Sequence, residues 1–600
     1  MMGLALFPPV LLAILSLGDR AASALGPPRS LTERLGLGLA AGLGILMVSF
    51  FLVAAAGLAS TVSAAALCGM FLALSGRNVR PLVLRLVGGV RSLERPYTAD
   101  GWAALGAAAF AALGGLMALA PPTGMDAGIL HFALPKVLLQ EGRLPLREDM
   151  ATPRSIGFTM VYAFGMALGG EILAKLLGYA SGVAAILLGA AAGERVRPGA
   201  GPWAALALAS TPFVSAHLGY EYLEMPALAF TLAGALCLLR YAGGEGSAWA
   251  VAAAAGAGFA VHAKSSAFAA ATIVPVALAL VWRRRDPRRW AILAACAAAF
   301  AATAGLWGLW WSFVYVPAQG GTAAAFLRDE VLSRPGAAEL ARAALRTVGV
   351  LATAGAYWSE SCGPLIVSGA AGAVLFRKHG ASIAFVPLLV LSVLVHIAVL
   401  AAASPLQILE PWFQGRYAAP AVIGFGAPTA GAFIHWARAR GGLLGGAVTV
   451  AAVALAAPLL GVKAARTAVA LPAAAGLESR SAYLSRKVES FAACAWINGL
   501  PRSDVRVLYM GYRPYYLDRP YIRCLDGTWA PFFRDIRSRE DFLRKLRSER
   551  VTHVLFERPR LPQADWLGDP RRFFASPPFR EVGRWDHPGG HWVLVSEFEP

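Results

Sequence analysis

The chain has 600 residues, of which 57% are hydrophobic and only 15% are charged. Its mean hydropathy is +0.57, whereas a soluble domain is close to half apolar and a quarter charged. This composition excludes an ordinary soluble globular protein. The formal net charge is +19. In a membrane protein such an excess collects in cytoplasmic loops, which explains the charge without nucleic-acid binding.

Apolar runs long enough to cross a bilayer recur along the chain and predict a polytopic α-helical membrane protein with about 13–15 spans. No cleavable signal peptide is evident, because no basic segment precedes the first run. Residues 156–193 are long enough for one span and a short re-entrant helix, and 346–376 for one oblique helix. The predicted spans are 3–19, 35–58, 60–76, 102–120, 171–193, 202–217, 226–242, 249–263, 266–282, 290–316, 364–376, 382–403, 417–436 and 442–460.

Four short basic segments set the predicted orientation. They are 77–95, 283–289, 377–378 and 438–440. Placing all four in the cytoplasm gives one consistent topology. The outward-facing segments are then 121–156, 217–225, 317–363, 404–416 and the tail after 460.

The tail has no further 20-residue apolar run and predicts a small extracytoplasmic α/β domain. Residues 505–511 and 552–557 are typical of buried strands, and 539–550 of an amphipathic helix. No glycine-rich phosphate loop occurs in it. We therefore expect three regions: 1–96 with extra helices and a basic loop, 97–465 with the main membrane domain, and 478–600. Cys494 and Cys524 are candidates for a disulfide if the tail is extracytoplasmic.

The first outward loop places ionisable groups beside the membrane. The candidates for function are Asp126, His131, Lys136 and Arg143. The alternative is structural: Asp126 could cap a helix over 126–140, and Lys136 could extend towards the membrane surface.

Three later segments place further polar groups at the ends of apolar runs. An acidic turn holds His217, Glu221 and Glu224, and a lysine at 264 lies between two apolar segments. Acids near a bilayer are often functional, although all of these groups could simply solvate helix ends. The last group, at the start of a late span, includes Gln414, Arg416 and Tyr417. An interfacial aromatic belt would explain the tyrosine but not the glutamine.

Together these outward segments predict a site for an anionic substrate carried by a lipid. Arginine and lysine would hold a phosphate, and a carboxylate would receive a proton. The charges gather at the outer helix ends, whereas a transporter is expected to bury them near the bilayer centre.

The order of these motifs resembles the C-type superfamily of integral-membrane glycosyltransferases, which includes protein O-mannosyltransferases and lipid A aminoarabinose transferases. The resemblance covers roughly 100–560 and leaves out the first three spans. Many relatives have Asp-Glu where this chain has Asp126-Ala127. The matching stretches are Asp126 with HFALPK (131–136), GRLP (142–145), GYEYLEMP (219–226), AKSSAF (263–268), GRYAAP (415–420), YYL (515–517) and THVLFE (552–557).

This resemblance implies an inverting transfer of a sugar from a polyprenyl-phosphate donor to a glycan, lipid or protein acceptor on the outer face of the plasma membrane. Asp126 would be the general base, and Glu221 or Glu224 would orient the acceptor or assist it. Lys136, Lys264 and Arg416 would hold the phosphate. No DxD motif occurs in the first outward loop, so we expect no metal cofactor. The alternatives are a transporter of a lipid-linked glycan, and a ligase or polymerase using a pyrophosphate lipid.

Overall fold

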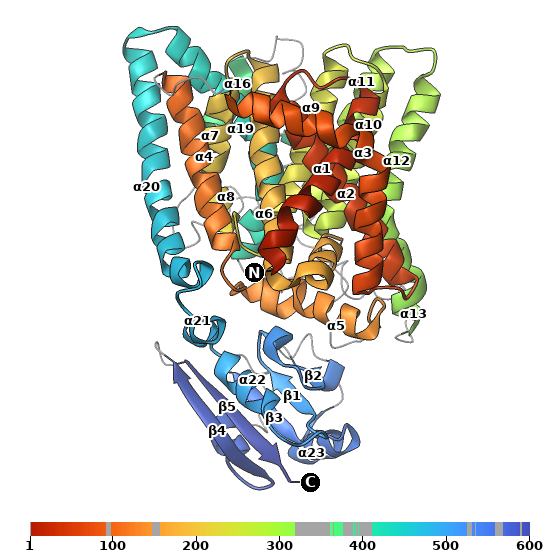
Figure 1. Ribbon diagram of the computed structural model, residues 1–600, viewed down its shortest axis with the longest axis vertical. Helices are drawn as coiled ribbons and strands as arrows, with labels where there is room; N and C mark the ends of the chain where they lie inside the picture. The colour runs from red at the N-terminus through yellow and green to blue at the C-terminus, as the bar shows by residue number, and fades with distance from the viewer. Residues whose placement is uncertain are drawn as a thin grey trace. The chain divides into compact units, whose positions relative to one another are not determined.

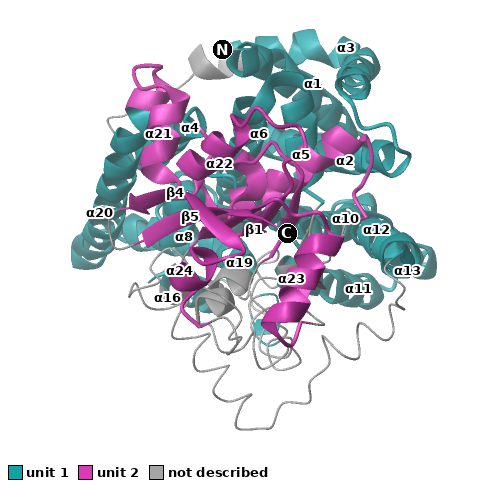
Figure 2. Ribbon diagram, turned by 90° about the horizontal axis from the view of Figure 1, so that it is seen from below, with its two compact units in different colours: residues 1–120, 154–471 teal, residues 121–153, 472–600 magenta. Residues whose placement is uncertain are grey.

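The computed structural model describes most of the chain as two compact units. Unit 1 contains residues 1–120 and 154–471, and unit 2 contains 121–153 and 472–600 (Figure 2). The first outward loop therefore groups with the tail. The described residues are 2–91, 98–146, 157–318, 361–363, 365–375, 388, 390–391, 394, 411–524, 531–533, 536–557, 568–587 and 591–599.

Unit 1 is a helical bundle (Figure 1), and eight of its described helices are long and apolar enough to cross a membrane. The predicted polytopic membrane fold is therefore confirmed. The span predicted at 382–403 lies almost entirely outside the described residues. The helices are α1 Met2–Leu25, α2 Leu31–Ala55, α3 Thr61–Arg91, α4 Ala99–Ala118, α6 Thr159–Val196, α7 Gly201–Ala209, α8 Pro212–His217, α9 Glu224–Ala242, α10 Ala248–Ala263, η2 Ser265–Thr272, α11 Ile273–Arg283, α12 Arg289–Trp310, η3 Trp311–Tyr315, α13 Val316–Ala318, α16 Leu365–Leu375, α19 Pro411–Ala439 and α20 Gly442–Ala474.

The helices of unit 1 are interrupted at two places, at Gly170 and between α7 and α8. Gly170 has a φ of +73° inside α6, which divides this element into a short helix and a longer span, as predicted for 156–193. The single span predicted at 202–217 is wrong. Thr211 accepts a hydrogen bond from the backbone N–H of Val214, and Pro212 begins a new helix, α8, after α7 has ended.

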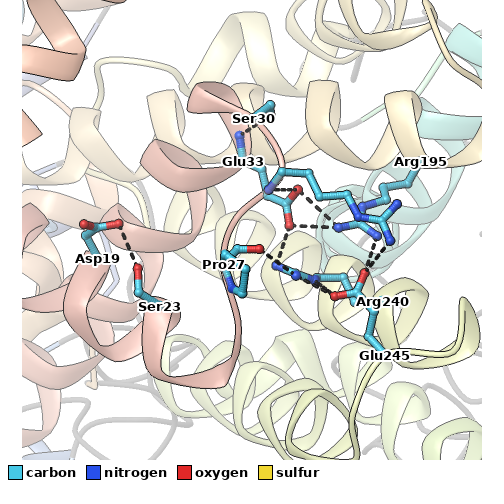
Figure 3. Close-up of polar contacts among 9 residues, drawn as sticks. Asp19, Ser23, Pro27, Ser30, Glu33, Arg195, Arg240 and Glu245 are labelled. Atoms are coloured by element: carbon cyan, nitrogen blue, oxygen red, sulfur yellow. Dashed lines mark hydrogen bonds and ion pairs between the residues drawn. The ribbon is translucent and has the colours of Figure 1, made fainter.

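A buried ionic cluster joins α2 to α6 and α9 of the bundle (Figure 3). Arg240 of α9 lies 2.8 Å from Glu33 of α2 and donates to Glu245 at 2.7 Å. Arg195 of α6 lies 2.7 Å from Glu245 and 3.2 Å from Glu33. The Arg240 guanidinium also covers the Trp249 ring at 3.6 Å. Each carboxylate thus contacts at least two arginines, which compensates for burying these charges.

Unit 2 contains a mixed sheet of five described strands in the order β2-β1-β3-β5-β4. Strand β1 is parallel to β2 and β3, and β5 is antiparallel to β3 and β4. The strands and helix predicted at 505–511, 552–557 and 539–550 are confirmed as β1, β3 and α23. The elements are η1 Ala127–His131, α5 Ala133–Glu141, α21 Arg480–Lys487, α22 Phe491–Asn498, β1 Val507–Met510, η6 Pro514–Tyr516, β2 Tyr521–Arg523, η7 Pro531–Phe533, α23 Arg539–Ser548, β3 His553–Glu557, α24 Pro570–Phe574, β4 Phe579–His587 and β5 His591–Phe598.

The suggested disulfide is wrong, because Cys494 and Cys524 are both buried and neither is part of a disulfide. Cys524 packs in a core with Leu508 and Phe542. Cys494 instead hydrogen-bonds the side chain of Tyr509. Since Leu508 and Tyr509 are consecutive in β1, their side chains point to opposite faces of the sheet. The two thiols therefore belong to different packing layers.

Candidate functional site

The acidic turn of unit 1 is fully buried and paired with lysines. Glu221 and Glu224 both have 0% exposure. Lys175 of α6 lies 2.8 Å from Glu221 Oε1, and Lys264 Nζ donates to Glu224 Oε1 at 2.5 Å. Buried charges persist when they are paired in this way. The turn is therefore an ordered part of the bundle and not a solvated helix end.

Backbone carbonyl groups accept hydrogen bonds from Lys175 and from another buried lysine, Lys463. Lys175 Nζ donates to the carbonyl oxygens of Met117 at 3.2 Å and Ala120 at 2.6 Å, at the end of α4. Lys463 of α20 is buried and donates to the carbonyl of Leu218. Backbone oxygens at the ends of helices are natural acceptors, since they lack intrahelical partners.

Lys175 and Lys463 were not among the residues proposed from the sequence. Lys175 is the only lysine in the apolar run 171–193, which was a usable signal. Lys463 lies just beyond the predicted end of the last span at 460, whereas α20 continues to Ala474.

Lys264 lies where a helix is interrupted. It follows α10 with extended backbone angles, φ −149° and ψ 112°, and precedes the 3₁₀ turn η2. Tyr162 of α6 donates to the carbonyl of Tyr222 at 3.2 Å and lies near both acids. The interruption thus leaves the ammonium group against the acidic turn.

His217 and His262, both in unit 1, differ in their hydrogen bonding. His217 Nδ1 is 2.8 Å from the carbonyl oxygen of Phe213, and its ring packs against Tyr222 at 5.1 Å. His262 is buried, and its ring nitrogens have no hydrogen-bond partner among the described residues. Its carbonyl accepts the N–H of Gly157 at 3.1 Å.

The proposed base lies at the start of a π-helical turn in unit 2. Asp126 has helical backbone angles and is partly exposed, and its side chain makes no capping hydrogen bond. The capping alternative therefore loses its support. The turn η1 contains the buried His131. π-Turns are rare and occur frequently at functional sites.

The ammonium group of Lys136 is hydrogen-bonded to other residues of unit 2. Its Nζ donates to the carbonyl oxygens of Tyr515 and Leu517, both at 2.8 Å, and to Asp518 Oδ1 at 2.6 Å. An ammonium group has three donors, so all three have acceptors. Arg143, by contrast, is exposed just after Gly142 ends α5 with a φ of +72°.

The first turns of α19 contain Gln414, Arg416 and Tyr417. The structure describes the backbone of these residues but not their side chains. The other end of α19 is fixed by Arg438, which forms an ion pair with Asp100. Since Arg416 precedes Arg438 by 22 residues, a helix separates their backbones by about 33 Å. Arg416 thus lies towards the opposite end of the bundle.

The predicted site residues divide between the two units. Unit 1 brings Glu221, Glu224 and Lys264 together, with Lys175 added. Asp126, His131, Lys136 and Arg143 lie on one segment of unit 2. Within the described ranges, no group of three or more His, Cys, Asp or Glu side chains is arranged to hold a metal ion.

The helical bundle with its α/β tail is similar in fold to ArnT, in line with the expectation drawn from the resemblance to C-type glycosyltransferases. The crystal structure of ArnT from Cupriavidus metallidurans bound to undecaprenyl phosphate matches with a TM-score of 0.51 and 14% identity, over 83% of this chain and 98% of that one. The apo structure of the same protein matches with a TM-score of 0.52 and 15% identity, over 82% and 98%. No family model matches the chain, and no curated protein matches its sequence.

Proposed function

We propose that this protein is a membrane glycosyltransferase that moves a sugar from a polyprenyl-phosphate donor to an acceptor on the extracytoplasmic face of the plasma membrane. The main support is the match to a structure that contains undecaprenyl phosphate, over nearly the whole length of that protein. The buried lysine–glutamate pairs and an aspartate without a capping role are consistent with it. The sugar is a hexose or a pentose in this proposal.

Asp126 is the general base in the proposed reaction. Its carboxylate takes the proton of the acceptor hydroxyl, and the acceptor oxygen attacks the anomeric carbon from the side opposite the phosphate. The bond from that carbon to the phosphate oxygen breaks, and its electron pair leaves with polyprenyl phosphate. Because phosphate is a good leaving group, positioning and charge neutralisation supply the rest of the catalysis. The configuration of the sugar inverts.

The phosphate is held by cations and not by a metal ion in this proposal. The candidates are Lys264, Arg416 and Lys136, with His131, Arg143, His217, Gln414 and Tyr417 as further contacts to substrate. A phosphate that reaches Lys264 competes with Glu224 for the ammonium group. Glu221 and Glu224 would then orient the acceptor or keep the lysines charged until the donor arrives.

Replacing Asp126 with Asn tests this proposal directly. Purified protein in nanodiscs is given undecaprenyl-phosphate sugars and candidate acceptors, and released undecaprenyl phosphate is measured. Asp126→Asn should lower the rate about 10²–10⁴-fold, as expected for loss of a general base. Glu141→Gln is the matched control, since Glu141 is exposed on the same segment. Full activity in Asp126→Asn would remove this residue from the mechanism.

The same assay separates the alternatives. A transporter would move the lipid-linked sugar across the bilayer without releasing undecaprenyl phosphate. A ligase or polymerase would require the pyrophosphate lipid. Activity that disappears on chelation and returns with Mn²⁺ would refute the metal-free mechanism.

A further inference from the structure

Arg513 of unit 2 lies directly against the turn that carries Asp126. A methyl group added at Gly128 would lie 2.7 Å from Cγ and 2.8 Å from Cβ of Arg513. Only glycine therefore allows this approach, two residues after the proposed base. The contact joins segments far apart in the sequence but within one unit.

The guanidinium of Arg513 has unused donors. Its Nε and Nη1 are buried and have no hydrogen-bond partner among the described residues. Arginine keeps its charge at any physiological pH and presents its donors in a fixed fork. Burying such donors without acceptors is costly. These N–H groups are therefore suited to donate hydrogen bonds to oxygen atoms of a bound ligand.

One acid that interacts electrostatically with Arg513 already has other partners. Glu557 of β3 interacts electrostatically with Arg513, but its Oε2 accepts the backbone N–H of Tyr512 at 3.1 Å. Glu557 also shares a hydrogen bond with Glu489, and burial together with this contact raises the pKa of Glu557 to about 7. Near neutral pH it therefore balances only part of the arginine's charge.

The backbone of Arg513 is held in place. Its N–H donates to the Tyr509 hydroxyl at 3.1 Å, which in turn contacts Ser490. The following turn, η6, is fixed to the Asp126 segment, because Tyr516 donates to the carbonyl of Pro122. A fixed arginine loses little freedom on binding a ligand, so it can contribute specificity.

We propose that Arg513 binds an acidic group of the acceptor, so that the enzyme prefers acceptors carrying a phosphate or carboxylate. This inference rests on the proposed function. It assigns Arg513 to the acceptor because the base and the attacking hydroxyl occupy one side of the anomeric carbon in an inverting transfer, and the departing phosphate the other. The forked donors of arginine match both acidic groups.

Binding measurements on the full-length protein in nanodiscs test the inference without relying on transfer. The probes are glucose 6-phosphate, glucose and undecaprenyl phosphate, compared for wild type, Arg513→Gln and Arg513→Lys. Wild type should bind glucose 6-phosphate at least tenfold more tightly than glucose. Arg513→Gln should abolish that preference, Arg513→Lys should restore part of it, and affinity for undecaprenyl phosphate should not change.

Two further variants make the outcome decisive. Arg506→Gln removes a surface arginine paired with Glu549 in the same unit and should retain the preference. Gly128→Ala should reduce it, since the added methyl displaces Arg513. Absence of the preference in wild type, or its persistence in Arg513→Gln, would overturn the inference. Weaker binding of undecaprenyl phosphate in Arg513→Gln would also overturn it, by assigning the residue to the donor. Failure of sugar transfer with these results intact would refute only the proposed function.

Discussion

Lys264 Nζ lies 2.5 Å from Glu224 Oε1, and both side chains are almost completely buried. Lys264 lies in the break that follows α10, and Glu224 lies in the first turn of α9. A proposed phosphate ligand is thus neutralised by a proposed substrate-orienting acid. The charge of Lys264 becomes available to the lipid-linked sugar donor only if the ion pair with Glu224 opens or a proton is shared within it.

Breaking this pair from one side should destabilise the protein more than removing both charges. Glu224→Gln or Lys264→Met leaves an uncompensated buried charge and should cost about 3–5 kcal/mol, whereas the double variant should recover most of it. Thermal unfolding in detergent measures this. If Lys264 also binds the donor, the folded double variant should show weakened donor binding. Additive losses in the double variant would contradict the pairing.

Lys136 is predicted to attach the Asp126 segment to the tail. Lys136→Met removes three hydrogen bonds and should cost about 1–3 kcal/mol. The segment 121–146 should then be cleaved faster by a protease, as mass spectrometry of the fragments can show. Arg143→Gln is the control, because this exposed side chain should leave the cleavage rate unchanged. Equal cleavage in both variants would exclude the attachment.

Glu557 should make the stability of unit 2 depend on pH. Its pKa in the folded protein is raised from 4.5 to about 7, so the folded state holds a proton that the unfolded chain has lost. Stability should therefore fall as the pH rises from about 4.5 to about 7, by up to about 3 kcal/mol.

Glu557→Gln should remove this fall and unfold at a higher temperature than wild type at pH 8. Unfolding is followed in the full-length protein by tryptophan fluorescence between pH 5 and pH 8. Glu581→Gln, on the exposed part of β4, should retain the dependence. A wild-type midpoint that does not move over this range would contradict the prediction.

Arg240 is expected to be essential to the attachment of α2. Arg240→Met leaves Glu33 and Glu245 with fewer cations in a buried cluster and should cost about 3–5 kcal/mol in thermal unfolding. Arg29→Gln removes an exposed arginine that also contacts Glu245 and should cost about 1 kcal/mol or less. Similar losses of stability in both variants would show that the burial of Arg240 does not determine how much its ion pairs contribute.

The sequence predicted local structure well and the pairing of side chains poorly. Strands β1 and β3 follow from short apolar runs, and the two-part α6 follows from a run too long for one span. The break between α7 and α8 was missed because hydropathy averages over a window, although Thr211 and Pro212 form a recognisable helix start. The partner of Lys136 is Asp518, and that of Lys175 is Glu221. Such pairs depend on the whole fold, and no periodic pattern encodes them.

The grouping of residues 121–153 with the tail affects how this protein can be recombined with its structural neighbours. Lys136 with Asp518, Phe132 with Tyr515 and Gly128 with Arg513 are matched across hundreds of intervening residues. A chimera that imports a foreign tail at residue 472 would separate every one of these pairs. Exchanging both segments together would keep the pairs intact, so these two stretches form a single module for engineering and for evolution.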